Sequence, residues 1–244
     1  VSLSWDGGIS WIRPPLPISQ FYRISVDQQE PYQVMGSVQD LGTQAGPSNS
    51  LHDGGIFLSD WHTVGGGEAG YVVARPDDPK LIYAGEYLGF LSRYDDRIGQ
   101  SSHVGIYPDN GSGHGAVDLR HRFQWTAPIH ISPHDPTVVY HASQTLQRSR
   151  DGGQSWEIIS PDLSRNDASK QAWSGGPITG DNTGVEFYST IFAVAESPVE
   201  KGVIWVGTDD GLVHITRDDG ASWQQITPSG FPEWGTVAMI EVSS

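Results

Sequence analysis

The chain repeats one octamer three times: SWDGGISW at Ser4–Trp11, SRDGGQSW at Ser149–Trp156 and TRDDGASW at Thr216–Trp223. Each copy opens on a hydroxyl residue, has Asp at the third position and Gly at the fifth, and closes on Ser-Trp. An Asp carboxylate accepts hydrogen bonds from backbone N–H groups of its own turn, and Gly permits the positive φ of a tight hairpin. The Trp that follows can begin a strand and cover the loop. The octamer therefore predicts a fastened β-hairpin.

Twelve residues fill the conserved positions of these hairpins, and we assign them a structural role. They are Ser4, Asp6, Gly8 and Trp11 in the first copy, Ser149, Asp151, Gly153 and Trp156 in the second, and Thr216, Asp218, Gly220 and Trp223 in the third. Asp and Gly in turns already have this structural explanation, so it outweighs a catalytic role for these Asp residues.

Short strands surround the second and third octamers in the same order. We expect four strands in each of the segments 126–159 and 189–226, and a segment of about 40 residues is the size of one four-stranded propeller blade. Two further segments, 20–63 and 69–107, predict blades without the octamer. In the first of them we expect an insertion at Gly42–His52, and in the second a plain turn at Asp95–Gly99.

The expected fold is therefore an all-β propeller of four-stranded antiparallel blades, with about four full blades in one domain over residues 1–244. The blades span approximately 20–63, 69–107, 122–162 and 187–228. Residues 1–16 supply a half blade, and residues 234–244 supply only a first strand. An open arc leaves sheet edges exposed, which natural proteins avoid. We favour a fragment of a larger propeller protein, with closure of a small ring by the terminal strands as the alternative.

Composition excludes several classes of function. The 244 residues carry 14 Lys and Arg against 29 Asp and Glu, a formal net charge of −15, so nucleic acid and anionic membranes are unfavourable partners. The chain contains no Cys, which excludes disulfides, thiolate metal sites and Cys nucleophiles. No apolar run approaches the ~20 residues of a membrane span. We expect neither a cofactor nor a metal site.

The octamer resembles the Asp-box, or BNR, repeat of sialidase, xyloglucanase and sortilin-type propellers. Longer phrases, such as RFQWTAPIHISPHDPTVVY and GVIWVGTDDGLVHITRDDGASW, resemble exported bacterial proteins of the sortilin-like, BNR-repeat kind. The resemblance covers most of the chain and implies an extracytoplasmic protein: periplasmic, cell-surface or secreted. It implies little about chemistry, because a shared fold does not transfer function.

Within that resemblance, Asp60-Trp61, followed by Gly65–Gly67 and Pro76–Pro79, is similar to the surroundings of one catalytic Asp in xyloglucan-cleaving propellers. Inverting hydrolysis needs two carboxyl groups roughly 6.5–9.5 Å apart, and no second Asp matches. Asp60 is thus one candidate acid of two. Sialidases fit less well, because the Arg residues lie in no context that suggests an Arg cluster for a substrate carboxylate.

Loop residues on a rigid scaffold are the other candidates for a binding site. They are Gln39, Asp40, Trp61, His62, Glu68 and Trp125. Paired acids such as Asp209-Asp210 lack the alternating spacing of a calcium loop, so we interpret them as solvated turns. The expected function is a non-catalytic extracytoplasmic binding or assembly module that recognises protein or glycan, with other blades or subunits as further partners. The alternative is an inverting glycoside hydrolase of the xyloglucanase type acting on β-glucans.

Overall fold

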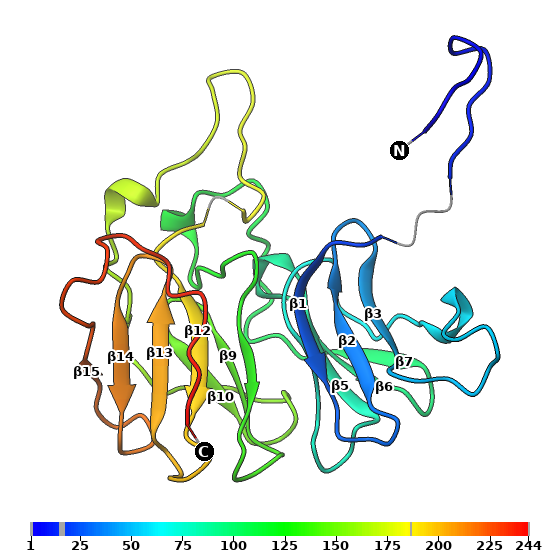
Figure 1. Cartoon of the computed structure of the whole chain (residues 1–244). Helices are drawn as coiled ribbons and strands as arrows, with labels where there is room; N and C mark the ends of the chain where they lie inside the picture. Colours follow the sequence, from blue (N-terminus) through cyan, green and yellow to red (C-terminus); the bar gives the residue numbers. More distant parts are fainter. Residues whose placement is uncertain (1, 15–17, 186, 244) are drawn as a thin grey trace.

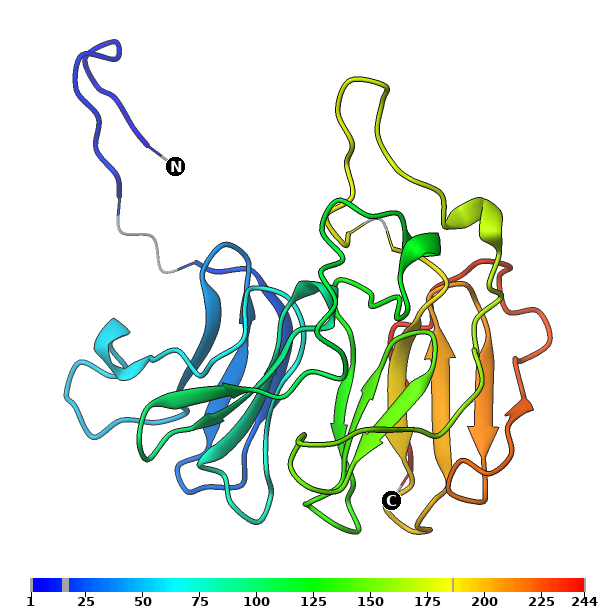
Figure 2. The same cartoon turned by 180° about the vertical axis from the view of Figure 1, so that it is seen from behind.

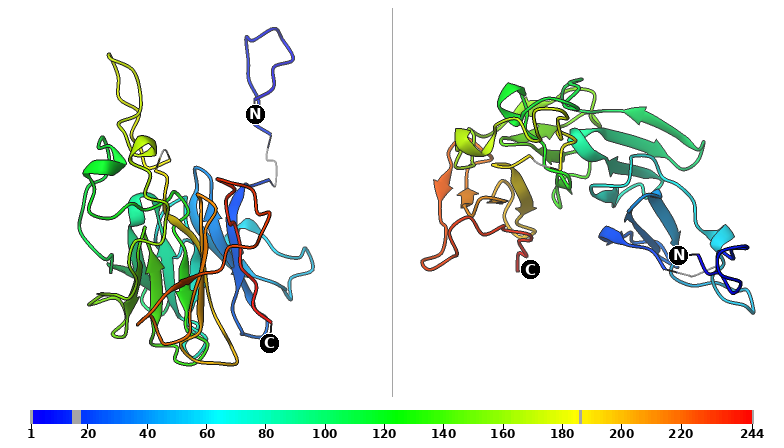
Figure 3. Two further views of the ribbon diagram at one scale, coloured as in Figure 1. Left: turned by 90° about the vertical axis from the view of Figure 1, so that its left-hand side faces the viewer. Right: turned by 90° about the horizontal axis from the view of Figure 1, so that it is seen from above.

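The computed structural model describes residues 2–14, 18–185 and 187–243. Four antiparallel sheets follow one another in sequence order, each built from consecutive strands. Viewed from above, they lie along an arc, with the first sheet at one end and the fourth at the other (Figure 3). The prediction of an all-β propeller of about four blades is confirmed. Among the described residues, no helix is long or apolar enough to span a bilayer.

The blades are numbered in chain order. Blade 1 contains β1 (Phe21–Val26), β2 (Gln33–Val38) and β3 (Gly42–Pro47), and blade 2 contains β4 (Val72–Ala74), β5 (Leu81–Gly85), β6 (Leu91–Asp95) and β7 (Gln100–His103). Blade 3 contains β8 (Ile129–Ile131), β9 (Val139–Ala142), β10 (Leu146–Ser149) and β11 (Glu157–Ile158). Blade 4 contains β12 (Ile191–Glu196), β13 (Ile204–Thr208), β14 (Val213–Thr216) and β15 (Gln224–Gln225).

Short 3-10 turns lie in the loops outside these sheets (Figure 2). They are η1 (Leu58–Asp60), η2 (Tyr87–Gly89), η3 (Ala116–Asp118) and η4 (Ala168–Lys170).

Blade 1 differs from its prediction. The segment expected to be an insertion contains β3, which pairs with β2 over its whole length, from Gly42 opposite Val38 to Pro47 opposite Gln33. In the part of the chain that the structure describes, blade 1 has no fourth strand, and a single bridge between Ala45 of β3 and His62 lies where that strand would pair. The sequence Gly-Thr-Gln-Ala-Gly-Pro has one β-branched residue and no aromatic one, so its composition does not reveal a strand.

Apolar residues fill the three spaces between successive blades. Met35, Ala45, Val72 and Ile82 are among those between blades 1 and 2. Tyr83, Leu91, Ile129 and Val139 are among those between blades 2 and 3. Tyr140, Leu146, Ile191 and Ile204 are among those between blades 3 and 4. Blades 2 and 3 therefore have a filled space on both of their faces, whereas β1 of blade 1 leaves Ile24 and Val26 exposed.

All three octamers form the same loop. In the second, the Ser149 hydroxyl donates to Asp151 Oδ1 at 2.8 Å and accepts from the Gly153 N–H at 2.8 Å, while the Ser155 N–H and hydroxyl donate to the Asp151 carboxylate at 2.9 and 2.5 Å. Equivalent bonds join the residues of the first and third copies. The fifth-position glycines have φ between 89° and 94°, a region that favours glycine.

The two ends of the chain, where we expect partial blades, contain less regular structure than the four full sheets. In the N-terminal segment, a single bridge joins Leu3 and Ile12, and the hairpin stands clear of the blades (Figure 1). Residues 234–243 contain no strand; Val237 donates its N–H to Thr208 O at 2.9 Å, beside blade 4. The predicted segments 1–16 and 234–244 also include residues 1, 15, 16 and 244, which lie outside the described residues.

Candidate functional site

The loops between the second and third strands of the four blades emerge on one face, which we call the mouth face. The octamer loops of blades 3 and 4 lie at the opposite ends of the strands, on the octamer face. One polar residue directly follows the second strand of every blade. These residues are Gln39, Glu86, Ser143 and Asp209. Because the four sheets share one topology, the repeat places a polar group from each blade on the mouth face.

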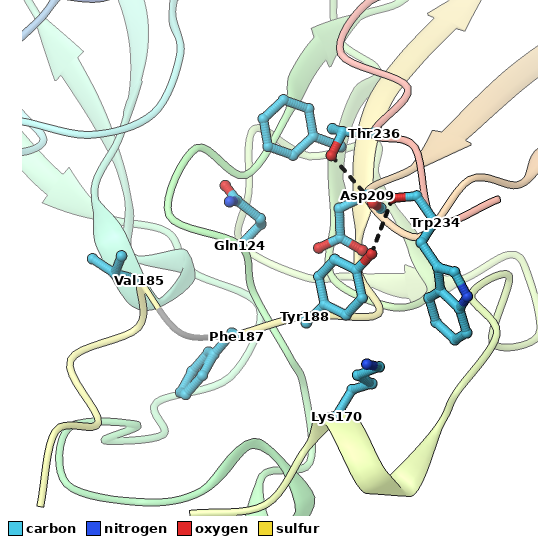
Figure 4. A pocket seen from close by; sticks show the side chains of 9 residues that line it. Gln124, Lys170, Val185, Phe187, Tyr188, Asp209, Trp234 and Thr236 are labelled. Carbon is cyan, nitrogen blue, oxygen red and sulfur yellow. Dashed lines mark hydrogen bonds between the residues drawn. The ribbon is translucent and has the colours of Figure 1, made fainter. Parts of the chain in front are cut away.

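The mouth face contains a pocket of about 600 Å³ beside blade 4, which we call the mouth pocket (Figure 4). Its lining combines aromatic rings with hydrogen-bonding side chains. The lining residues are Gln124, Lys170, Val185, Phe187, Tyr188, Phe192, Asp209, Trp234 and Thr236. They come from the segment before β8, from η4, from the segment leading into β12, from β12 itself, from the residue after β13 and from the chain after blade 4.

Asp209 is the carboxyl group of this lining. Its side chain is buried and accepts the Thr190 N–H at 2.9 Å and the Thr190 hydroxyl at 2.7 Å. Burial is the largest influence on it and raises its pKa to about 7, although the hydrogen bonds from Thr190 act in the opposite direction. Asp209 therefore exchanges a proton near neutral pH, unlike an ordinary surface carboxylate.

The neighbouring Asp210 is also buried, but it is tied into the scaffold. The Thr208 hydroxyl donates to Asp210 Oδ1 at 2.6 Å, and the Arg165 N–H donates to Oδ2 at 2.8 Å. The interpretation of Asp209-Asp210 as a solvated turn is therefore wrong. The chain after blade 4 contributes to covering this turn, since the Thr236 hydroxyl donates to Asp209 O at 3.2 Å. Asp209 and Gln39 each follow the second strand of their blade, and this shared position is the sequence signal that could have identified Asp209.

Trp234 is the largest ring of the lining. The Arg165 guanidinium lies 4.8 Å and the Lys170 ammonium 5.3 Å from its centroid, both within cation–π range. The Tyr188 ring stacks against it at 6.2 Å between centroids, and the Tyr188 hydroxyl donates to Trp234 O at 3.3 Å. These contacts hold the indole in the lining, and Figure 4 shows the Tyr188 ring between it and the Asp209 carboxylate.

Four of the predicted binding residues lie in a second group on the mouth face, around Tyr22. The Tyr22 hydroxyl donates to Gln39 Oε1, and the Tyr22 ring meets the Trp125 ring edge-on at 6.5 Å. Glu68 Oε2 accepts the Asp40 N–H at 2.6 Å, and Gln39 Nε2 donates to Asp40 Oδ1 at 3.3 Å. The structure therefore brings Gln39, Asp40, Glu68 and Trp125 together.

Glu86 and Tyr87 extend this second group. The Tyr87 ring stacks on Trp125 with 5.1 Å between centroids and an interplanar angle of 11°. Burial raises the pKa of Glu86, and the nearby Glu68 carboxylate adds to that shift. Two carboxyl groups thus approach each other here, and neither Glu86 nor Tyr87 was singled out by the sequence.

Asp60, Trp61 and His62 lie instead along the outer strand position of blade 1. Asp60 Oδ2 accepts the Phe57 N–H at 2.7 Å and so closes its own 3-10 turn. The Trp61 ring packs across Gly46 of β3, and His62 Nε2 lies 3.1 Å from Asp96 Oδ1 of blade 2. These contacts involve only blades 1 and 2, and the structure does not bring the three residues to the mouth pocket. Among the described residues, no group of three or more His, Asp and Glu side chains is arranged to hold a metal ion.

Comparison with known proteins gives fold similarity at low identity. No family model matches the sequence, and no curated protein matches it. A computationally designed protein, Ika8, is 12% identical with a TM-score of 0.47 over 91% of this chain and 53% of its own. The GH74 xyloglucanase of Xanthomonas campestris is 18% identical with a TM-score of 0.49 over 82% of this chain and 29% of its own. This chain thus spans about half of the first protein and less than a third of the second.

Proposed function

We propose that this protein is a non-catalytic β-propeller module that binds a glycan in the mouth pocket. The composition of that pocket is the observation that supports the proposal. Trp234, Tyr188 and Phe187 offer rings, while Asp209, Gln124 and Lys170 offer hydrogen-bonding groups in the same lining. A sugar ring presents C–H groups on its faces and hydroxyls around its edge, which matches a pocket of rings and a few polar groups.

In the same proposal the three octamers are Asp boxes with a structural role. Their shared hydrogen-bond network supports this, because each Asp carboxylate is engaged within its own loop. The extracytoplasmic location also belongs to the proposal, and it rests on the resemblance of the octamers and longer phrases to exported Asp-box proteins.

Binding is tested by isothermal titration with a panel of neutral β-glucan and xyloglucan oligosaccharides. We expect Trp234→Ala to weaken binding about tenfold or more, as truncation of a central aromatic residue usually does. Trp173→Ala is the matched control, because Trp173 is 56% exposed and does not belong to the lining. If neither the wild type nor the control binds any member of the panel, or if Trp234→Ala binds as well as wild type, the glycan proposal fails.

An inverting glycoside hydrolase is the second candidate function, and the raised pKa of Asp209 favours it. A general acid needs a pKa near the working pH, and burial provides this for Asp209. The mechanism also needs a second carboxyl group roughly 6.5–9.5 Å away. Among the described residues that line the pocket, Asp209 is the only carboxyl group, and this favours binding over hydrolysis.

Hydrolysis is tested by measuring reducing-sugar release from β-glucans and xyloglucan. Wild type, Asp209→Asn and Asp60→Ala are compared at equal concentration. The binding proposal expects no release above a buffer blank for any of them. Release by wild type that is lost in Asp209→Asn but kept in Asp60→Ala would instead establish an enzyme with its acid in the mouth pocket.

A further inference from the structure

Two octamers each clamp the outer end of the preceding blade in the same way. The residue after the outer strand is Val104 in blade 2 and Ile159 in blade 3. Each donates its N–H to the third strand of its own blade, to Leu91 O and Leu146 O, at 2.9 Å. Each accepts an octamer indole N–H on its carbonyl oxygen, from Trp156 and Trp223 respectively, again at 2.9 Å.

The octamer glycine completes this clamp. A Cβ atom on Gly153 would lie 2.6 Å from Val104 Cβ, and one on Gly220 would lie 2.6 Å from Ile159 O. The absence of a side chain therefore lets each octamer loop approach the preceding blade closely. The octamer is thus a docking element as well as a turn, and its acceptor is the residue after an outer strand.

Blade 4 presents a third acceptor of this kind at Ile226. Its N–H donates to Val213 O of the third strand at 2.7 Å, as in the two occupied cases, and its side chain is 36% exposed. Within the described ranges no indole N–H donates to its carbonyl oxygen. The outer end of blade 4 therefore has the features of an octamer acceptor.

The N-terminal octamer is the matching donor. Its loop has the full hydrogen-bond network, yet Trp11 is 65% exposed and its indole N–H donates to Gly8 O of the same hairpin at 3.2 Å. A Cβ atom on Gly8 would meet only the Trp11 ring, at 3.7 Å. Trp5, Ile9 and Ile12 of this hairpin are also largely exposed. The N-terminal octamer therefore has the structure of the other two, but among the described residues its Trp makes no hydrogen bond to a blade.

The space between blades 4 and 1 already contains an inner segment. Val237 is buried over Gly207 of β13, and its N–H donates to Thr208 O at 2.9 Å. The next carbonyl, Ala238 O, accepts Arg23 Nη2 of β1 at 2.9 Å. This segment thus contacts both end blades, in the position of an inner strand for a fifth blade.

The connection from the hairpin to β1 has a suitable length. Residues 13–20 join Ile12 to β1, and residues 63–71 join the His62 bridge of blade 1 to the inner strand β4 of blade 2. The two connections are nearly equal, and the second already spans from an outer strand position to the inner strand of the next blade. An intramolecular partner also has a high effective concentration.

We propose that the N-terminal hairpin, residues 3–12, docks on blade 4 of its own chain, with the Trp11 indole N–H donating to Ile226 O. It then forms the outer part of a fifth blade whose inner segment is 236–240. Docking would bury the exposed Trp11 ring of the hairpin against blade 4.

Cross-linking tests this docking in the full chain, which has no native Cys. Ile9→Cys on the hairpin is combined with Gln225→Cys on β15 and treated with a short bismaleimide. Both positions are exposed, so the substitutions leave the core intact. The matched control pairs Ile9→Cys with Gln100→Cys, an exposed residue on the outer strand of blade 2. Mass spectrometry of the digested monomer band identifies the joined peptides.

We expect the Ile9–Gln225 pair to cross-link within one chain at a yield at least about fivefold above the control pair, as a high effective concentration requires. Adding Trp11→Ala should return the yield to the control level. A yield equal to the control, or one unchanged by Trp11→Ala, would overturn the proposal. Joined peptides found only in a dimer band, with a yield that rises with protein concentration, would replace it with docking on a second copy.

Discussion

The octamer face and the mouth face use the same residue type in opposite surroundings. On the octamer face, Asp151 is exposed, and hydrogen bonds from the Ser155 hydroxyl above all lower its pKa to about 2. On the mouth face, Asp209 is buried, and its burial raises its pKa to about 7. The first arrangement stabilises an ionised turn, whereas the second maintains a carboxyl group that can be neutral. The difference separates the residues that fasten the hairpins of the propeller from those that we propose bind a ligand.

The largest expected effect is the loss of a clamp on the octamer face. Trp156→Ala removes a ring that packs between blades 2 and 3 and donates to Val104 O, so we expect it to lower the free energy of unfolding by about 3 kcal/mol. Urea denaturation measures this. Trp5→Ala is the control, because Trp5 is 81% exposed. Equal urea midpoints for Trp156→Ala and Trp5→Ala would contradict a structural role for the octamer Trp.

The next effect concerns pH and the mouth face. The folded pKa of Asp209 lies above its unfolded value of 3.8, so the stability it contributes is full below about pH 4 and is lost as the pH rises through about 7. Relative to Asp209→Asn, wild type should lose about 2 kcal/mol of unfolding free energy between about pH 5 and about pH 8. Comparison with the variant cancels the other titrating groups. A difference that stays constant with pH would contradict the buried carboxyl.

A smaller effect should follow from filling the space at an octamer glycine. Gly153→Ala places a Cβ atom 2.6 Å from Val104 Cβ at a φ of 89°, and we expect a cost of about 1–2 kcal/mol in urea denaturation. Gly230→Ala imposes a similar φ of 82°, but a Cβ atom there would have no neighbour within 4 Å. The comparison thus separates packing against the preceding blade from backbone strain, and a larger loss for Gly230→Ala would refute the clamp geometry.

The smallest effect is the acid sensitivity of the octamer face. The folded pKa of Asp151 lies below its unfolded value, so its contribution is present above about pH 4 and is lost as the pH falls toward 2. Asp151→Asn should therefore be less stable than wild type at neutral pH, and the gap should narrow on acidification. Thermal unfolding from pH 6 down to pH 2 measures this stability difference. Glu233→Gln is the control, because Glu233 is exposed. A stability difference between wild type and Asp151→Asn that widens in acid would contradict a lowered pKa for Asp151.

Local patterns in the sequence predicted the octamer face well, because each octamer fixes its own turn. The strands around Asp151 and Asp218 lie within the predicted segments for that reason. β3 was missed because its residues carry little strand propensity and are stabilised by pairing with β2. Asp209 was misjudged because its burial depends on tertiary contacts, including the chain around Trp234 and Thr236, which follows blade 4. Such desolvation is a tertiary effect, so spacing and composition do not reveal it.

The contrast between the two faces is tested most directly by NMR titration of the Asp side-chain carboxyl carbons. Resonances are assigned with the Asp→Asn variants at positions 151 and 209. We expect Asp209 to titrate near pH 7 and Asp151 near pH 2 in the same sample. Titration of both residues near the ordinary Asp value of about 4 would contradict the contrast between the buried carboxyl group of the mouth face and the hydrogen-bonded carboxylates of the octamer face.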